Sequence, residues 1–126
     1  MVSGLGIDMI EVERISFNIN KDAGFKELVF SSGEIIYCES MPNKFQHYAA
    51  RFAAKEAFFK ALGTGWADGT AFNEVEIIND VLGKPEIVIT GKTKETLSAY
   101  GAFKISVSLS HLATIASAVV IIEKES

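Results

Sequence analysis

The sequence predicts an α+β fold with a largely antiparallel sheet, because helix signals dominate the first half of the chain and strand signals dominate the second. The longest helical pattern spans residues 44–62, whereas several later segments alternate apolar and polar side chains with the period of two that strands require. A doubly wound fold would alternate strands and helices along the whole chain. We therefore expect one domain over residues 1–126, with about five strands and three or four helices.

The first half of the chain contains one strand pattern followed by helix patterns. The segment SGLGIDMI predicts a strand of about six residues that ends near Asp8, and the segment 12–29 starts as a helix before polar residues and a glycine interrupt it. The segment SSGEIIYCES begins with two serines and Glu34, which is typical of a capped helix start. Pro42 separates this helix from the long one over 44–62, and Gly63 supplies the stop.

The second half of the chain predicts a hairpin, a short helix and two further strands. The segments FNEVEIIN and EIVIT flank the turn NDVLGKP, so we expect them to form the two strands of the hairpin. The segment KTKETLSAYG predicts a short helix that Gly101 closes. The segment KISVSLSH alternates apolar residues with serines and predicts a half-buried strand, whereas TIASAVVIIE is apolar almost throughout and predicts a central strand.

Composition and charge argue against several classes of protein. Hydrophobic residues make up 48% of the chain and charged residues 22%, which is typical of a globular protein rather than a disordered one. The net charge of −4 argues against nucleic-acid binding, which usually needs a basic excess. Cys38 is the single cysteine, so we expect no internal disulfide and a reducing, cytoplasmic location. No signal peptide pattern is present, and no apolar run approaches the roughly 18 residues of a membrane span.

One acidic residue, Glu56, lies on an apolar face of the predicted long helix. At about 100° per residue, Glu56 falls among four apolar side chains that lie within about 40° of one direction, namely Phe45, Ala49, Phe52 and Phe59. Burying a carboxylate there is costly unless another group pairs with it. The simplest partner is Lys60, one turn later on the same helix, in a purely structural ion pair.

A metal site is the alternative explanation for Glu56. Asp8 is a second isolated carboxylate, and it closes an apolar strand far away in the sequence. Two carboxylates from different elements that face one cleft suit Mg²⁺, which typically takes one or two protein carboxylates and completes its shell with water and phosphate oxygens. Lys60 lies only about 40° around the helix from Glu56, so it could share the same polar pocket.

The remaining motifs carry weaker signals. Gly4 and Gly6 lack the full spacing of a dinucleotide-binding fingerprint, so we reject that function. The sequence GTG at 63–65 fits a helix cap followed by a turn. His111 stands at a strand end, where loops often carry function, although a lone histidine is more often structural. We assign His47, on the long helix, to the surface.

Four segments of the chain together carry a family resemblance. They are GLGIDMIEVERI (4–15), RFAAKEAFFKALGTG (51–65), NEVEIINDVLGKPEI (73–87) and VSLSH (107–111). In this order and spacing they resemble the holo-[acyl-carrier-protein] synthases, which are group I 4′-phosphopantetheinyl transferases. The resemblance implies a small α+β subunit with helices packed on one side of the sheet. It also implies a homotrimer with active sites at the subunit boundaries.

The resemblance further implies the reaction and its residues. Phosphopantetheine would move from coenzyme A to a serine of apo-acyl carrier protein, with Mg²⁺, and adenosine 3′,5′-bisphosphate would leave, in a step of fatty acid biosynthesis. By similarity, Asp8 and Glu56 hold Mg²⁺, Lys60 contacts a phosphate of coenzyme A, and His111 belongs to the catalytic set. The nucleotide end of coenzyme A would lie among a larger set of residues, namely Arg51, Asn79, Gly83, Lys84, Pro85 and His111. The base that takes the serine proton stays open between a magnesium-bound water, Glu11 and His111.

Two features depart from the family pattern. Three basic residues that could dock an acidic carrier (Arg14, Lys21 and Lys26) are diluted by four acidic ones, namely Glu11, Glu13, Asp22 and Glu27. Ser106 and Leu112 occupy places where many relatives carry a histidine and a polar residue.

Two other functions compete with the transferase. One is a non-catalytic trimeric module that binds coenzyme A or a carrier protein, and the other is a hydrolase of another phosphate ester. Asp8, Glu56 and Lys60 favour the transferase over the module, because a pure binder has no need of a metal at the scissile phosphates.

Overall fold

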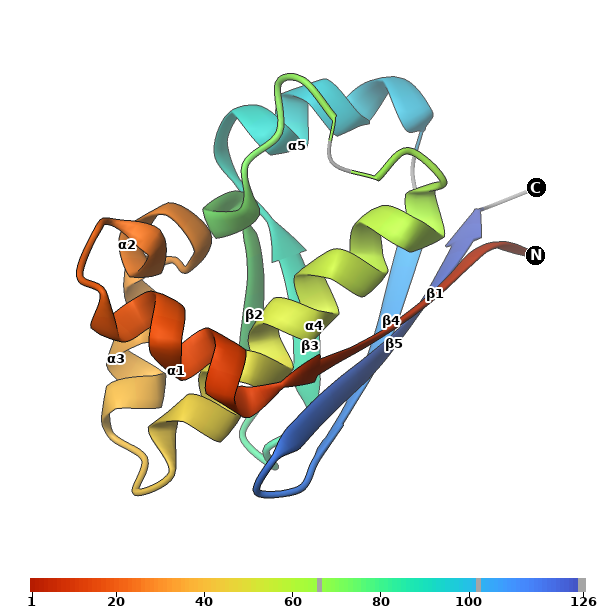
Figure 1. Cartoon of the computed structure of the whole chain (residues 1–126). Coiled ribbons are helices and arrows are strands. Elements are labelled where there is room, and N and C mark those ends of the chain that lie inside the picture. The colour runs from red at the N-terminus through yellow and green to blue at the C-terminus, as the bar shows by residue number, and fades with distance from the viewer. Residues whose placement is uncertain (66, 102, 125–126) are drawn as a thin grey trace.

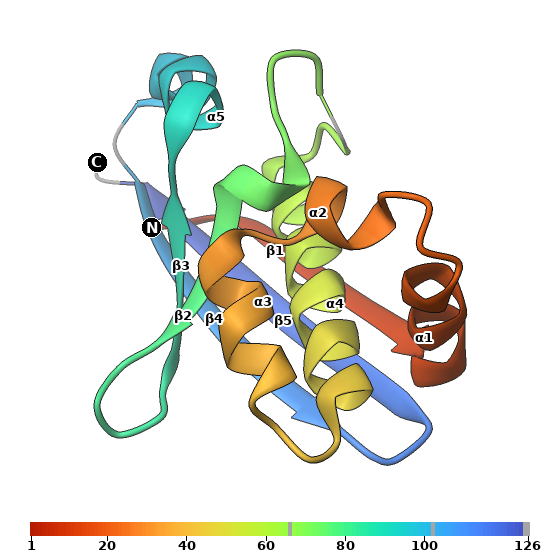
Figure 2. The same cartoon turned by 90° about the vertical axis from the view of Figure 1, so that its left-hand side faces the viewer.

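Helix α4 crosses one face of a three-stranded sheet, and the smaller helices lie on the same side of that sheet (Figures 1 and 2). This computed structural model describes residues 1–65, 67–101 and 103–124. In chain order the elements are β1 (Val2–Glu11), α1 (Val12–Asn20), α2 (Phe25–Val29), α3 (Ser32–Glu39), α4 (Lys44–Leu62), β2 (Val75–Asn79), β3 (Pro85–Ile89), α5 (Gly91–Leu97), β4 (Phe103–His111) and β5 (Ile115–Lys124), with short 3-10 turns at Phe72–Glu74 and Ser98–Tyr100.

The main sheet has the strand order β1-β5-β4, and both pairings are antiparallel. The apolar strand β5 is central, as predicted, and every second residue from Ala116 to Ile122 is buried on the side that α4 covers. Strands β2 and β3 form the predicted hairpin in a second, two-stranded sheet. The expected α+β class with mostly antiparallel strands is confirmed for the described residues.

Local sequence signals located helices α3, α4 and α5, but the described residues form five α-helices instead of the expected three or four. Helix α4 begins and ends at the predicted residues, and Gly63 closes it in the left-handed conformation with a φ of 82°. At the start of α3, the Ser31 hydroxyl accepts a hydrogen bond from the Glu34 backbone N–H at 3.2 Å, and the Glu34 carboxylate accepts one from the Ser31 N–H at 2.9 Å. The ambiguous segment 12–29 forms two short helices, and the turn between them contains Gly24 with a φ of 93°.

Two strand predictions need correction. Strand β1 has 10 residues instead of about six, and Asp8 lies inside it because pairing with β5 continues to Glu11 opposite Ile115. Residues 72–74 form a 3-10 turn instead of the start of β2. In that turn the Glu74 carboxylate accepts hydrogen bonds from the Thr93 N–H at 3.0 Å and the Thr93 hydroxyl at 2.7 Å, which bends the chain toward α5.

The backbone of α4 lies directly on β1 at two glycines. A Cβ on Gly4 would overlap the carbonyl oxygen of Ala61, and a Cβ on Gly6 would overlap that of Ala57. Side chains two positions apart on a strand share one face. Asp8 therefore follows Gly4 and Gly6 on the face that α4 covers, and its side chain is only 17% exposed.

None of the described helices covers the opposite face of β1. It carries three apolar side chains that are about two-thirds exposed, at 64%, 64% and 66%, namely Leu5, Ile7 and Met9. Among the described residues, no helix is both long enough and apolar enough to span a membrane.

We expect Gly6→Ala to destabilise the fold strongly, because the new methyl group would force α4 away from β1. Overpacking of this kind costs about 1–3 kcal/mol, and the rigid backbone partner places Gly6→Ala at the upper end. Urea denaturation at fixed protein concentration measures the loss. Gly24→Ala is the control, since its Cβ would meet open space and the left-handed backbone alone costs about 1–2 kcal/mol. Equal stability of Gly6→Ala and the wild type would contradict this packing.

Candidate functional site

Asp8 and Lys60 form an ion pair between strand β1 and helix α4. The Lys60 ammonium donates to the Asp8 carboxylate at 2.9 Å and to the Ile7 carbonyl oxygen at 3.0 Å. The Lys60 side chain is 53% exposed, so its charge is open to a ligand from solvent. In the described part of the chain, this link across to β1 takes the place of the ion pair with Glu56 that the helix spacing suggested.

Glu56 lies half-buried close to this pair. Its pKa is raised above the usual range, first by burial and then by the negative charge of Asp8, while Lys60 acts in the opposite direction. The two carboxylates therefore repel each other across the space between β1 and α4, and a cation placed there would relieve the repulsion. We call Asp8 and Glu56, together with Lys60, the carboxylate site.

The donor set of the carboxylate site fits Mg²⁺. Both carboxylates are hard oxygen ligands, and no group of three or more His, Cys, Asp or Glu side chains gathers into a metal cage within residues 1–65, 67–101 and 103–124. A metal at the carboxylate site would thus take the rest of its shell from water or from a ligand. Mg²⁺ binds in this way, through one or two carboxylates plus waters and substrate phosphates.

A second group of predicted residues gathers at a hollow of about 410 Å³ on the other side of α4. All six residues that the family resemblance placed around the nucleotide line it, namely Arg51, Asn79, Gly83, Lys84, Pro85 and His111. Tyr37, His47 and Ser108 also line it and were missed by the sequence analysis. No carboxylate is among the described lining residues, so we call this feature the basic hollow.

Arg51 is the most deeply buried charge of the basic hollow. It is 2% exposed, its Nη2 donates to the Asn79 side-chain oxygen at 2.6 Å, and its guanidinium lies 4.2 Å from the centre of the Tyr37 ring. Its Nε atom is buried without a hydrogen-bond partner, and no carboxylate of the described residues pairs with it. A buried cation without a counter-ion is costly, so this arrangement suits an anionic ligand.

The hairpin turn is held rigidly beside Arg51. The Asn79 side-chain amide donates to the Gly83 carbonyl oxygen at 3.0 Å, and the Asp80 carboxylate accepts from the backbone N–H groups of Leu82 and Lys84, each at 2.9 Å. Gly83 completes the turn with a φ of 88°, which favours glycine. The turn therefore presents Lys84 to the basic hollow in a fixed position.

His47 is half-buried in the basic hollow, so its assignment to the surface is wrong. Its ring centre lies 5.4 Å from that of His111, at the end of β4, and 5.8 Å from that of Tyr37. The pKa of His47 is lowered, first by burial and then by His111 and Arg51. The i,i+4 spacing of His47 and Arg51 on α4 was the signal that could have placed both residues on one side of the helix.

The carboxylate site and the basic hollow occupy opposite flanks of α4. Asp8 on β1 and Leu109 on β4 both lie opposite Ala118 of the central strand, which places them about 10 Å apart on the two edges of the sheet. Figure 2 shows β1 and β4 on either side of β5, with α4 running in front. His47 and Glu56 likewise lie about 180° apart around the helix. One chain does not bring His111 together with Asp8, Glu56 and Lys60.

A model of the 4′-phosphopantetheinyl transferase superfamily matches residues 4–116 of the chain. The chain belongs to this superfamily. The family that the sequence motifs indicated is therefore confirmed, and the protein is an enzyme, a phosphopantetheinyl transferase.

Individual members of the superfamily are similar over almost the whole chain. The holo-[acyl-carrier-protein] synthase of Ruminiclostridium cellulolyticum is 52% identical over 94% of this chain and 90% of its own length. The crystal structure of the synthase from Neisseria meningitidis has a TM-score of 0.87 at 33% identity and covers 98% of this chain and 100% of that one. The Bacillus anthracis synthase, in complex with CoA (3′,5′-ADP), has a TM-score of 0.83 at 31% identity and covers 99% of both chains.

A buried ion pair that the sequence did not reveal ties the hairpin of this phosphopantetheinyl transferase to α4. The Lys55 ammonium donates to the Glu34 carboxylate at 2.7 Å and to the carbonyl oxygens of Phe72 and Val75 at 2.8 and 2.6 Å. The other Glu34 oxygen accepts from the Ile77 N–H at 3.0 Å, and both charged side chains are 0% exposed. Burial lowers the pKa of Lys55, while the neighbouring Glu34 acts in the opposite direction. This network fixes the basic hollow, because β2 leads directly into its turn.

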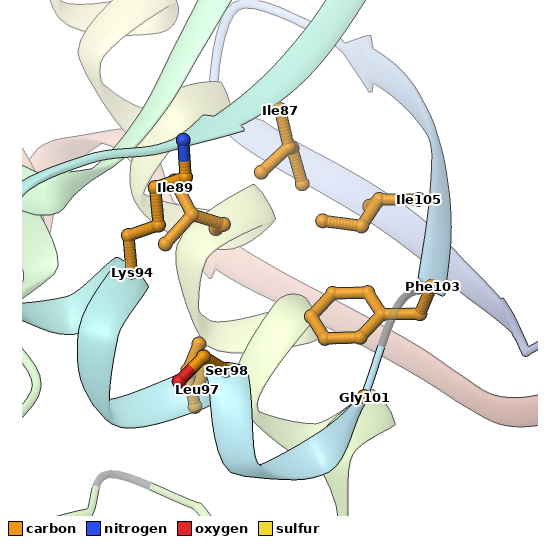
Figure 3. Close-up of a pocket in the computed structure, with 8 residues that line it drawn as sticks. All are labelled: Ile87, Ile89, Lys94, Leu97, Ser98, Gly101, Phe103 and Ile105. Atoms are coloured by element: carbon orange, nitrogen blue, oxygen red, sulfur yellow. The ribbon is translucent and has the colours of Figure 1, made fainter.

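A second, apolar hollow of about 320 Å³ lies between the two sheets, where β3 faces β4 beside helix α5 (Figure 3). Five apolar side chains form its walls, namely Ile87, Ile89, Leu97, Phe103 and Ile105, and Lys94 and Ser98 also line it. It contains none of the residues predicted for the site. We therefore assign it no part in the transferase chemistry.

We expect Lys55→Met to destabilise the fold by about 3–5 kcal/mol, because it leaves the Glu34 carboxylate buried without its partner. Lys44→Met is the matched control. Lys44 pairs with Glu39 at 3.2 Å, but the two side chains are 40% and 38% exposed, so the loss should stay below about 1 kcal/mol. Thermal or urea unfolding of both variants at one protein concentration gives the comparison. A Lys55→Met variant as stable as Lys44→Met would show that the buried network does not hold the hairpin.

Proposed function

We propose that the protein transfers the 4′-phosphopantetheine group of coenzyme A to a serine of an apo-acyl carrier protein. The reaction depends on Mg²⁺, releases adenosine 3′,5′-bisphosphate and serves fatty acid biosynthesis in the cytoplasm. The observation that carries this proposal is the presence of a carboxylate site and a basic hollow on one helix of a phosphopantetheinyl transferase. The similarity to holo-[acyl-carrier-protein] synthases supports an acyl carrier protein as the acceptor of the phosphopantetheine group. The coenzyme A complex of the B. anthracis enzyme supports coenzyme A as its donor.

The basic hollow suits the nucleotide end of coenzyme A. Arg51 supplies a buried positive charge that lacks a counter-ion among the described residues, and Lys84 adds a second charge from a rigid turn. Phosphate groups accept charge-assisted hydrogen bonds from such donors. The hollow's volume of about 410 Å³ falls within the range of about 300–1,000 Å³ that is typical of small-molecule sites.

The carboxylate site suits the pyrophosphate. Asp8 and Glu56 would hold Mg²⁺, which when bound supplies positive charge to the phosphoryl oxygens and stabilises the charge that develops on them. The Lys60 ammonium adds a further positive charge from the helix, since more than half of its side chain is exposed. Asp8 restricts the position of that ammonium through the 2.9 Å contact.

The reaction itself requires one proton transfer and one displacement. The serine oxygen of the carrier attacks the phosphorus next to pantetheine, the bond from that phosphorus to the bridging oxygen breaks, and the nucleotide leaves with the electron pair. Lys60 would neutralise the negative charge that grows on the departing phosphate. Glu11, at the exposed end of the strand that carries Asp8, is the chain's own candidate for the base.

A homotrimer would complete the site. The carboxylate site and the basic hollow face away from each other on α4, so one coenzyme A molecule bridges them most simply at a boundary between two copies. The uncovered face of β1 offers apolar surface for such a contact, since Leu5, Ile7 and Met9 stand about two-thirds exposed. We propose that copies of the chain associate through this face, and that the basic hollow of one copy meets the carboxylate site of the next.

The acidic carrier would dock on helices α1 and α2. Arg14 and Lys21 lie on or directly after α1, and Lys26 lies on α2. The Lys21 ammonium lies 4.7 Å above the ring of Phe17, which is 62% exposed. An exposed aromatic ring beside positive charge suits a partner that combines acidic and apolar side chains.

The transfer reaction tests the function directly. Incubation of the protein with apo-carrier, coenzyme A and Mg²⁺, followed by mass spectrometry of the carrier, should show the added phosphopantetheine.

The same assay tests the metal assignment through Glu56→Gln. We expect this variant to fold normally, because the half-buried amide no longer repels Asp8. We expect it to lose transfer activity by at least about 100-fold, since even outer-shell partners of a metal contribute about 10–100-fold. Glu95→Gln, an exposed carboxylate on α5, is the control. Near-normal turnover of Glu56→Gln at limiting Mg²⁺ would refute the metal assignment, and an unmodified carrier with the wild type would refute the transferase.

The assembly can be tested with two matched isoleucines. Ile7→Glu should keep the fold, because the side chain is already 64% exposed, but it should dissociate the trimer and abolish transfer. Ile36→Glu, at a 73% exposed position of α3, should leave both the trimer and the activity intact. Light scattering combined with size-exclusion chromatography gives the mass of each variant. An active monomeric wild type would contradict the shared site.

A further inference from the structure

Two imidazole rings face each other in the basic hollow, although they come from distant parts of the chain. His47 belongs to α4 and His111 to the end of β4, and their ring centres lie 5.4 Å apart with an angle of 66° between the planes. Tyr37 of α3 packs against His47 from another side, with 5.8 Å between the ring centres and an angle of 76°. Three elements therefore fix the position of His47, and both histidines line the same hollow.

Every described charge that faces His47 is positive or can become positive. Arg51 lies one turn further on α4, Lys84 comes from the hairpin turn, and His111 comes from β4. From α3, Tyr37 contributes its aromatic ring. In the absence of a ligand, burial together with His111 and Arg51 lowers the pKa of His47, so its imidazole is neutral at neutral pH.

We propose that His47 is a further binding residue of the basic hollow, where it and His111 together seat the 3′-phosphate monoester of coenzyme A and take up a proton as the phosphate binds. The inference rests on the proposed function, which supplies this ligand. A phosphate monoester is close to a dianion at neutral pH, whereas each phosphate of the pyrophosphate bridge carries a single charge. A dianion beside two imidazoles favours their charged form.

The proton balance of this step is simple. One proton moves from solvent to a ring nitrogen of the pair, and no covalent bond to the coenzyme changes. Because the rings interact, the proton belongs to the pair and not to one residue. Binding that takes up a proton strengthens as the pH falls, by at most about tenfold per pH unit. Below about pH 6 the phosphate itself becomes protonated and the gain ends.

The pair would also provide specificity. A nucleotide without the 3′-phosphate would bring no dianion to His47 and would leave Arg51 without an anion. Adenosine 3′,5′-bisphosphate should therefore bind with proton uptake, whereas adenosine 5′-monophosphate should bind more weakly and with little or none. The comparison isolates the contribution of the 3′-phosphate.

Calorimetric titration of the assembled protein with adenosine 3′,5′-bisphosphate tests the inference. Measurements in two buffers of different ionisation enthalpy count the protons taken up, and we expect about one per site for the wild type. His47→Phe keeps an aromatic ring between Tyr37 and His111, and should bind about tenfold more weakly with less than about half of the proton uptake. Lys92→Met, which removes an exposed cation of α5 outside the hollow, is the control and should match the wild type.

The outcomes separate this inference from the proposed function. A His47→Phe variant with wild-type affinity and proton count would overturn the role of His47 while leaving nucleotide binding, and so the function, intact. A wild type that binds neither this nucleotide nor coenzyme A would overturn both. The ¹⁵N resonances of the His47 ring in the wild type give a readout that needs no variant. They should shift toward the protonated form when adenosine 3′,5′-bisphosphate is added, and unchanged resonances would refute the proton uptake.

Discussion

The direct contact between the backbone of α4 and strand β1 is the constraint on which the rest of the structure depends. Only a residue without a Cβ fits at Gly4 and Gly6, because the carbonyl oxygens of Ala61 and Ala57 occupy that space. The contact fixes the axis of α4 along the β1 side of the sheet. It thereby sets which helix side chains face Asp8 and which face the opposite sheet edge, where β4 ends.

The buried pair of Lys55 and Glu34 fixes the position of the β2–β3 hairpin relative to α4. The Lys55 ammonium donates hydrogen bonds to the backbone carbonyl oxygens of Phe72 and Val75, where the chain enters β2. The Glu34 carboxylate accepts one from the N–H of Ile77. Since both side chains are fully buried, their positions depend on packing rather than on solvent. Helix α4 therefore fixes the position of the hairpin turn at the basic hollow, as it fixes the position of Asp8.

Features with a local cause could be predicted from the sequence, and features with a tertiary cause could not. The bounds of α4, the capping box at Ser31 and the hairpin turn follow from residues close in sequence, and Asp8 and Glu56 stood out as isolated carboxylates. The length of β1 depends on its pairing with β5. Lys60 pairs with Asp8, and His47 packs on His111, only because strands bring distant residues beside α4.

The carboxylate site and the basic hollow lie on opposite flanks of α4, and this placement has a genetic consequence in the proposed trimer. Each copy would donate a carboxylate site to one boundary and a basic hollow to another. Two alleles that damage different flanks would each encode an inactive protein, yet mixed assemblies would contain some boundaries at which both contributing flanks are intact. Such alleles should complement each other in one cell, whereas two alleles that damage the same flank should not.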